Sequence, residues 1–218
     1  MRAPGAAELL EAWGQSAALG PVGREDALLR LAFPDEDPAV LSSGERTARL
    51  LELRELLFGR DFEGTAACPE CGEAVEYALD AAQLPPDEPV ELEPALRAPT
   101  GADLALVAAA PDVDAARALL VEHCVGPGLP PEVVAAAVER LAAADPLGDA
   151  ELELACPKCR SEWLVSLDIG AWLWSELESW SRRTVLDVHA LASAYGWSEA
   201  EVLALGPRRE LYLELVGG

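Results

Sequence analysis

Two short stretches, Cys68-Pro69-Glu70-Cys71 and Cys156-Pro157-Lys158-Cys159, give the strongest indication of how this chain of 218 residues folds. Each is a Cys-Pro-x-Cys pair, and a shift of 88 residues superposes one on the other. The flanking sequence matches as well, because segments 63–80 and 151–168 both start with glutamate and both end with Leu-Asp. We therefore interpret the two segments as copies of one structural unit.

The spacing of the cysteines predicts a metal site. A gap of two residues lets both thiolates of a tight turn reach one ion at about 2.3 Å, and two such turns complete a tetrahedron. Four thiolates leave no position for water or a substrate, so the metal is expected to be structural. The expected ligands of a single Zn²⁺ are Cys68, Cys71, Cys156 and Cys159. Lys158, the only lysine of the chain, is placed to offset part of their negative charge.

Two other interpretations of the cysteine pairs stay open at this point. One is a redox-active Cys-x-x-Cys, which normally lies at the start of a helix after a strand, and the other is two separate half-sites. Alternating apolar residues such as Trp163, Val165 and Leu167 instead predict strands around each pair, as in the hairpins of a zinc ribbon. Gly72 suits the left-handed conformation that ends such a turn, whereas the second copy departs from this pattern with Arg160.

Helices are expected on both sides of the first pair. The N-terminal part predicts helices over 6–18, 24–32 and 43–58, the last with a capping box of Ser42 and Glu45. Between the pairs, residues 84–99 carry five prolines and are expected to be extended or irregular. Further helices can begin at Thr100, Asp112 and Pro131, and Asp145-Pro146 ends the last of them.

After the second pair, an apolar stripe at spacings of three and four residues predicts one helix over 169–195, ended by Gly196. A capping box of Ser198 and Glu201 opens a short helix over 199–205, and a last helix covers 208–215.

The predicted fold class is therefore α+β and mostly α-helical. A small antiparallel pair of zinc-ribbon-like hairpins carries a helical insertion, and a long helical segment follows. The predicted regions are an N-terminal helical region 1–60, a first zinc hairpin 61–82, a proline-rich connection with the helical insertion 83–148, a second zinc hairpin 149–168 and C-terminal helices 169–218.

Two tryptophans are candidate contacts for a partner protein. Trp174 falls about 200° around the predicted helix from Trp172, so the two rings are expected to face different surfaces. An exposed Trp174 or Trp197 would suit the anchor of a protein interface, while the alternative for either ring is packing in the core.

The charge of the chain bears on its partners. Lys and Arg number 16 against 39 Asp and Glu, so the formal net charge is −23. Such a surface repels phosphate backbones and anionic lipid heads, which argues against nucleic acid and membrane surfaces as partners. There is no run of 18 apolar residues, and Glu8 interrupts the position where a secretory peptide needs its apolar stretch. A cytoplasmic protein is expected.

The sequence carries no recognisable catalytic motif, so we do not expect an enzyme. Serine nucleophile elbows, glycine-rich phosphate loops and H-E-x-x-H helices are all missing. The two histidines, His123 and His189, have no catalytic partner in their sequence neighbourhood. Cys124 is expected to be a small buried hydrophobe, with a substitute zinc ligand as the alternative.

Several segments together resemble a known family. They are Leu53-Arg54-Glu55-Leu56-Leu57-Phe58-Gly59 before the first cysteine pair, Pro99-Thr100-Gly101-Ala102-Asp103 and Asp145-Pro146-Leu147 between the pairs, and Asp187-Val188-His189-Ala190-Leu191-Ala192 and Tyr195-Gly196-Trp197-Ser198-Glu199-Ala200-Glu201 near the end. With the two cysteine pairs, this combination resembles the T-even-type phage baseplate hub assembly chaperone family of contractile phage tails and phage-like contractile injection systems. The resemblance implies a non-enzymatic role in assembling the hub and central spike of a baseplate.

The leading hypothesis is therefore a zinc-stabilised protein-interaction factor whose partners are baseplate hub or spike proteins. One alternative is a structural baseplate component retained in the finished particle. Another is a zinc-ribbon protein that binds nucleic acid, which the shortage of cations disfavours. An enzyme with an unrecognised acidic site is the third.

Overall fold

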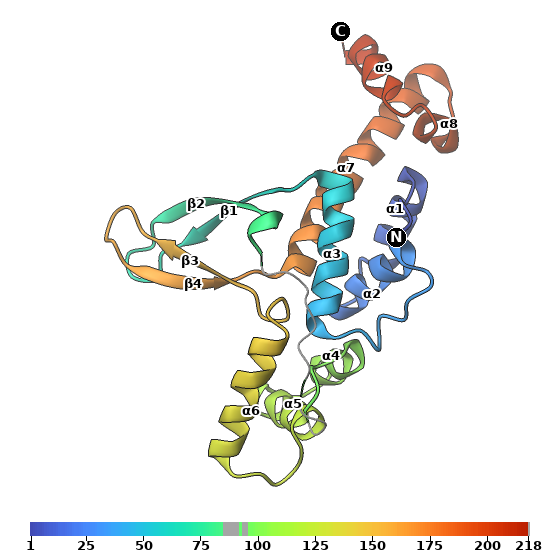
Figure 1. The fold of residues 1–218 in the computed structure, drawn as a ribbon. Helices are drawn as coiled ribbons and strands as arrows, with labels where there is room; N and C mark the ends of the chain where they lie inside the picture. The colour runs from blue at the N-terminus through green and yellow to red at the C-terminus, as the bar shows by residue number, and fades with distance from the viewer. Residues whose placement is uncertain (85–91, 93–95, 218) are drawn as a thin grey trace.

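The computed structural model describes residues 1–84, 92 and 96–217 (Figure 1). The chain is α+β and mostly α-helical, as expected. Its helices are α1 (Ala6–Ser16), α2 (Pro21–Ala32), α3 (Ser43–Phe58), the 3-10 helix η1 (Ala81–Gln83), α4 (Gly101–Ala108), α5 (Val113–Cys124), α6 (Pro131–Ala144), α7 (Ile169–Tyr195), α8 (Glu199–Leu203) and α9 (Arg208–Gly217). The strands form two hairpins, β1 (Asp61–Ala67) with β2 (Ala74–Asp80) and β3 (Glu151–Ala155) with β4 (Glu162–Ser166).

Four helices, α1, α2, α3 and the first half of α7, form the body of the molecule. Their apolar faces meet in one core, which buries Leu28, Leu29, Leu53, Leu173 and Leu177 almost completely. The helices begin where local chemistry favours it. Ser42 accepts a hydrogen bond from the Glu45 N–H while the Glu45 carboxylate accepts one from the Ser42 N–H, which confirms the predicted capping box. Helix α2 begins at Pro21, three residues before the expected start, because proline suits the first turn of a helix.

Helix α7 is a single helix of 27 residues, as the apolar stripe predicted. Asp168 caps its start by accepting a hydrogen bond from the Ala171 N–H, and Gly196 ends it with φ of 72°. Its far half extends past the body and carries α9, while α8 lies back against α1 (Figure 1). Within the described residues, not even α7 combines the length and apolar character that crossing a membrane requires.

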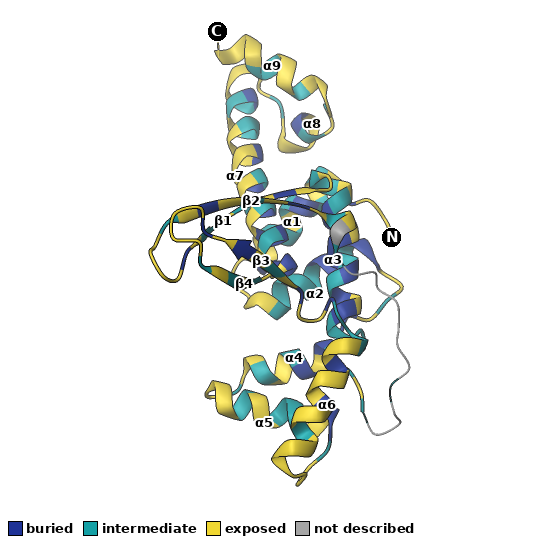
Figure 2. Ribbon diagram, turned by 60° about the vertical axis from the view of Figure 1, so that its left-hand side comes forward, coloured by how far each residue is buried: buried dark blue, intermediate teal, exposed yellow. Residues whose placement is uncertain are grey.

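The two hairpins project side by side from the body as an arm (Figures 1 and 2). Their registers are equivalent: Ala67 pairs with Ala74 in the first hairpin, and Ala155 pairs with Glu162 in the second. A shift of 88 residues therefore superposes the strand pairing as well as the sequence. In each hairpin one face is apolar and inward, and the other is exposed. The segments 61–80 and 151–166 are called the arm below.

Helices α4, α5 and α6 form a separate lobe beyond the N-terminal ends of α2 and α3 (Figures 1 and 2). Thr100 and Asp112 precede α4 and α5, Pro131 opens α6 and Asp145 follows its end, as expected. A small core of its own holds the lobe together, with Cys124, Val125, Ala137 and Leu141 buried. The predicted irregular segment 84–99 lies largely outside the described residues. We call 96–148 the insertion lobe.

The insertion lobe is tied to the body through the backbone at the start of α3. The Ser43 N–H donates to the Pro99 carbonyl at 2.8 Å, and Ser42 and Thr100 form an antiparallel bridge. Gly101 sits against the Pro38 carbonyl so closely that a Cβ there would come within 2.2 Å of that oxygen. Only glycine allows this approach, so the backbone of the lobe is fixed to the body at its entry.

Candidate metal centre

The four cysteines of the predicted site lie in two tight turns at the tip of the arm. In the first turn, the Gly72 N–H donates to the Cys68 carbonyl at 2.9 Å, and in the second the Arg160 N–H donates to the Cys156 carbonyl at the same distance. Gly72 has φ of 71° and Arg160 has φ of 64°. The departure from glycine in the second copy therefore does not change the turn, because Arg160 adopts the left-handed conformation all the same.

The structure brings all four thiols together. Their Sγ atoms lie within 4.8 Å of one another, although the two pairs are 88 residues apart in the chain. The shortest separations cross between the hairpins: Cys68 Sγ lies 3.6 Å from Cys159 Sγ, and Cys71 Sγ lies 3.6 Å from Cys156 Sγ. One cluster is present, which agrees with one shared site and not with two half-sites.

This arrangement fits a tetrahedral metal ion. With metal–sulfur bonds of 2.3 Å, the edge of a regular tetrahedron is about 3.8 Å, close to the shortest separations between the sulfurs. Thiolate donors of this number and spacing suit Zn²⁺, which would take one sulfur from each of Cys68, Cys71, Cys156 and Cys159. Such an ion has its coordination filled by the protein, so its contribution is to join the two hairpins.

The four sulfurs differ in exposure. Cys68 and Cys156 are each 2% exposed and pack with Val75 and Trp163 from the inward faces of the hairpins, whereas Cys71 and Cys159 face solvent. The apolar residues cover the cluster on the side toward the body. An ion would therefore enter from the tip of the arm, where two of its ligands are reachable from water.

Hydrogen bonds from backbone N–H groups stabilise the thiolate forms of Cys156 and Cys159. The N–H groups of Cys159 and Lys158 lower the pKa of Cys156 to about 6. The Ser161 N–H favours the Cys159 thiolate in the same way, but loss of hydration and hydrogen bonds with the other thiols outweigh it and raise the pKa of Cys159 to about 12. The thiolate form is therefore favoured at Cys156 and disfavoured at Cys159. A bound cation would replace the thiol protons, as in other thiolate sites.

An ion pair joins the two turns beside the cluster. Lys158 Nζ donates to a carboxylate oxygen of Glu73 at 2.7 Å, so the second hairpin contacts the first outside the sulfurs as well. The position of Lys158 near the thiolates was expected from the sequence, whereas the position of Glu73 was not. No pattern marked it, because the matching position of the second copy is Ser161.

Trp174 is not an exposed anchor, so that expectation is wrong. Its side chain belongs to the core and is only 7% exposed, with the Arg24 guanidinium 4.9 Å from the ring centroid. Trp172 does face another surface, but the first hairpin covers it: the Phe62 ring lies 5.0 Å away, edge to face. Helix α2 thus covers the face of α7 that carries Trp174, and the first hairpin covers the face that carries Trp172. The periodicity of α7 alone does not indicate that both faces are covered.

Trp197 lies at the far end of α7, in an aromatic cluster. Its ring stacks on Tyr195 at 4.6 Å and meets Tyr212 of α9 edge to face at 5.0 Å. The side chain is half-buried, and Tyr195 is 41% exposed. These contacts fix α9 against α7, and the role of Trp197 in a partner interface stays a prediction.

His123 and Cys124 have separate surroundings in the insertion lobe. His123 Nδ1 lies 2.9 Å from a carboxylate oxygen of Asp103, which also accepts two hydrogen bonds from Arg97. Cys124 is 3% exposed in the core of the lobe, and burial raises the pKa of its thiol. It lies outside the group of four sulfurs, which agrees with the prediction of a small buried hydrophobe.

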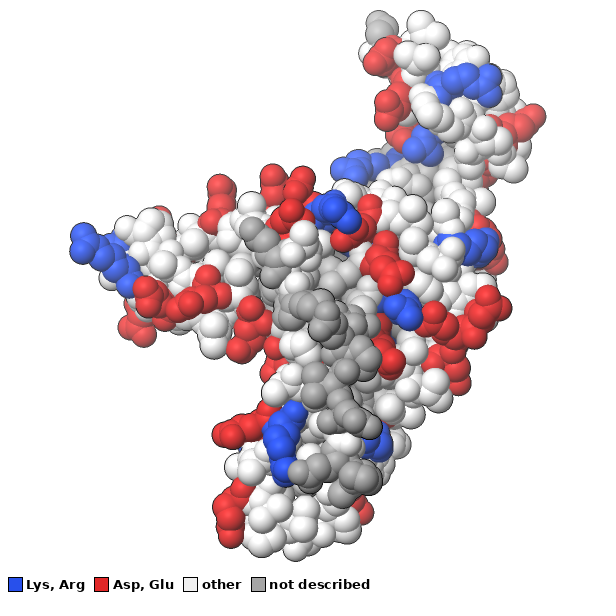
Figure 3. All heavy atoms as spheres, in the orientation of Figure 1, with Lys and Arg blue, Asp and Glu red and all other residues white. Residues whose placement is uncertain are grey.

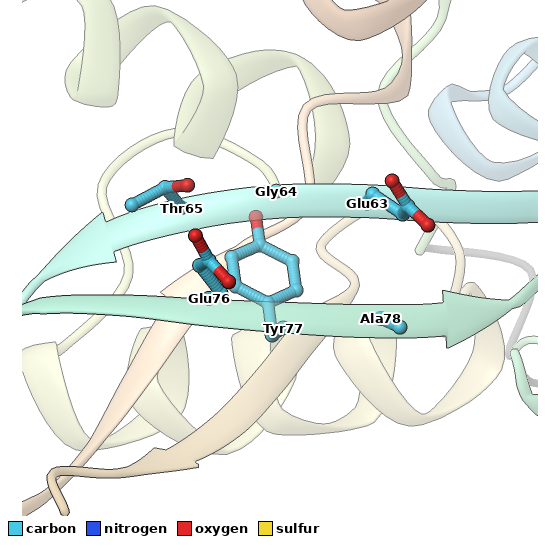
Figure 4. A pocket seen from close by; sticks show the side chains of 6 residues that line it. All are labelled: Glu63, Gly64, Thr65, Glu76, Tyr77 and Ala78. Carbon is cyan, nitrogen blue, oxygen red and sulfur yellow. The ribbon is translucent and has the colours of Figure 1, made fainter.

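The first hairpin carries a shallow hollow where Gly64 pairs with Tyr77 (Figure 4). The Tyr77 ring lies over the glycine, and the carboxylates of Glu63 and Glu76 lie on either side of that ring (Figure 4). A side chain at position 64 would come within 2.6 Å of the tyrosine ring, so glycine and tyrosine here fit as a pair. The hollow is therefore a consequence of strand packing, lined by Thr65 and Ala78 besides these four.

Comparison of the chain with family models, with curated proteins and with solved structures finds no match.

Proposed function

We propose that this protein is a non-enzymatic interaction factor in the cytoplasm, stabilised by one structural Zn²⁺, that helps to assemble the hub or spike of a contractile baseplate. The observation that supports it best is the cluster of four sulfurs contributed equally by two turns 88 residues apart. A metal ion with four thiolate ligands has no position left for a substrate, so the role of the ion is to stabilise the fold.

The shape of the chain supports a role in protein contacts. The arm, the insertion lobe and the pair α8–α9 each extend from the body in a different direction (Figures 1 and 2). Each extension has its own cluster of packed side chains and leaves apolar side chains exposed, among them Leu106, Leu164 and Leu211. Surface of this kind, on extensions from one body, suits simultaneous contact with several subunits.

The net charge of the protein favours basic proteins as its partners. With a formal net charge of −23, the protein repels other acidic surfaces and attracts basic ones at long range. The resemblance of its segments to baseplate hub assembly chaperones names the system in which such a partner is to be sought.

Co-expression with hub and spike proteins of a contractile baseplate tests the proposal. We expect a co-purifying complex that carries about one Zn²⁺ per chain and weakens as salt rises from about 50 to 500 mM, because exposed charge contacts are screened. Cys71→Ser, which removes one ligand, should lose both the zinc and the complex, while Cys124→Ala should keep both. Absence of any complex at low salt would contradict the proposal, and so would a chain that purifies without metal and still binds.

A further inference from the structure

The outward face of the second hairpin combines exposed glutamates with an exposed leucine. Because side chains alternate along a strand, Leu152, Leu154, Trp163 and Val165 lie on the inward face of β3 and β4. The outward face then consists of Glu151, Glu153, Ala155, Glu162, Leu164 and Ser166, all of them exposed. The sheet has two strands, and within the described residues no element packs on this face.

Within the part of the chain that the structure describes, the carboxylates of this face are uncompensated. Among the described residues, none forms an ion pair with Glu151, Glu153 or Glu162. The acidic side chains follow the arm, and the cations gather at its tip, where Lys158 already contacts Glu73 (Figure 3). No two of these glutamates lie directly opposite each other in the register, but their three carboxylates share one face, which favours a cationic partner.

Leu164 interrupts this acidic face. Its side chain is 59% exposed and lies directly opposite Glu153 in the register. The matching position of the first hairpin is Glu76, so an outward glutamate in one copy is a leucine in the other. Solubility does not account for that difference, because both positions face solvent. Three carboxylates border this leucine together with Ala155 and Ser166, and an exposed apolar side chain with such a border has the layout of an interface anchor with a polar rim.

We infer that the outward face of β3–β4, centred on Leu164, docks a basic amphipathic helix of a partner protein. Glu153 lies about 5 Å from Leu164 across the pair, and Glu162 lies about 7 Å away along the strand. On a helix, residues three and four positions from an apolar side chain lie about 5–6 Å from it, so arginines there can reach these glutamates. This inference rests on the proposed function and names the contact surface and its ligand.

A designed peptide tests the inference on the full-length, zinc-loaded protein. The probe is an 18-residue labelled helix with one central leucine, arginines three and four positions to either side and alanine elsewhere. Fluorescence anisotropy should give an affinity for this peptide at least tenfold higher than for a scrambled peptide of the same composition. Leu164→Glu, which copies the residue of the first hairpin, should weaken binding about tenfold although it adds a negative charge.

The Leu164→Glu variant distinguishes a specific contact with the leucine side chain from nonspecific electrostatic attraction. If the peptide bound only through the net charge, Leu164→Glu would leave the affinity unchanged or increase it, and either outcome would overturn the inference. The paired variant Glu153→Gln with Glu162→Gln should weaken binding at low salt, whereas Glu63→Gln with Glu76→Gln on the other hairpin should change it less than twofold. Equal loss from both pairs would also overturn it, as would equal binding of the scrambled peptide.

The co-expression experiment distinguishes this failure from failure of the proposed function. If wild-type protein and Leu164→Glu both co-purify fully with a hub or spike protein, the assembly role stands and this docking face is wrong. If neither yields a complex while the designed peptide still depends on Leu164, the docking face stands and the assembly role is wrong. Zinc content and circular dichroism of each variant check that the arm is folded.

Discussion

Asp145, which ends α6, accepts a hydrogen bond from Ser43 Oγ at 2.9 Å, 102 residues earlier in the chain. The same carboxylate oxygen accepts the Gly44 N–H at 3.0 Å, in the first turn of α3. Asp145 thus acts as a second cap for a helix to which it does not belong, at an end where carboxylates are favoured by the helix dipole. The exit of the insertion lobe is fixed to the same helix end as its entry.

Replacing Asp145 with alanine should loosen the insertion lobe and lower the free energy of unfolding by about 1–2 kcal/mol, the usual cost of losing a cap. Asp145→Asn keeps an acceptor oxygen and should cost less than half of that. Urea denaturation measures both values. An equal loss for the two variants would contradict a capping role and would indicate that the charge alone matters.

Gly72 and Arg160 both adopt the left-handed conformation, but this conformation is strained for arginine and not for glycine. No atom lies within 4 Å of a Cβ built on Gly72, so Gly72→Ala adds backbone strain without a clash. It should lower the stability of the zinc-loaded protein by about 1 kcal/mol, and Arg160→Gly should raise it by a similar amount. Thermal unfolding of the two variants is the measurement. A destabilised Arg160→Gly would indicate that the arginine charge beside the thiolates outweighs its backbone strain.

Asp103 should make the stability of the insertion lobe depend on acid. Hydrogen bonds from Arg97, and then from Thr100 and His123, hold the pKa of this buried carboxyl well below its usual range. A carboxyl with a lowered pKa stabilises the folded state above its unfolded pKa of about 4, and that stabilisation is lost as the pH falls below this value.

Asp103→Asn should therefore cost about 2 kcal/mol at pH 7, because it removes the negative charge paired with Arg97 and turns one of the two acceptor oxygens into a donor. The gap between wild type and variant should shrink by about 1 kcal/mol at pH 3. Urea midpoints at the two pH values measure it, with the exposed Glu122→Gln as the matched control. A gap that is the same at both pH values would show that the ionised form of Asp103 has no special role.

Removal of zinc should open the arm and leave the body folded. The core of α1, α2, α3 and α7 contains none of the four ligands, although Phe62 and Leu79 at the base of the first hairpin pack into it. Toward the tip, the inward faces of the hairpins meet around the ligands. Because metal binding to such sites contributes on the order of 10 kcal/mol, chelation should abolish hydrogen-exchange protection in the tip half of each strand while most of the helical circular dichroism remains at 25 °C. Protected strands in the chelated protein would show that the ion is dispensable.

Patterns that act over a few residues predicted much of this fold. The capping boxes at Ser42 and Ser198, the proline at the start of α6 and the glycine after α7 each fixed a boundary through chemistry within one turn. The alternation around the cysteines predicted both hairpins, and their shared offset predicted that four sulfurs would meet. These features need no knowledge of tertiary contacts.

Features that depend on distant partners could not be predicted in this way. Nothing in the sequence around Arg54 indicates burial, yet its side chain is 2% exposed, forms a bidentate ion pair with Glu176 of α7 and stacks on the Phe62 ring at 3.9 Å. Its burial is possible only because a carboxylate 122 residues away neutralises it. The burial of Trp174 depended in the same way on α2.

Because the insertion lobe lies between the two cysteine pairs, proteolytic cleavage within it would divide the metal ligands between two fragments. Gly126 to Pro130 form a turn between α5 and α6 whose residues from Pro127 onward are exposed, which is where a protease would cleave most readily. Each fragment would retain one hairpin and two of the four sulfurs, and one would carry α1–α3 while the other carried α7. The severed halves would be held together twice, by the core that α1–α3 share with α7 and by the metal site, so a chelator would release the hairpins from each other without separating the two polypeptides.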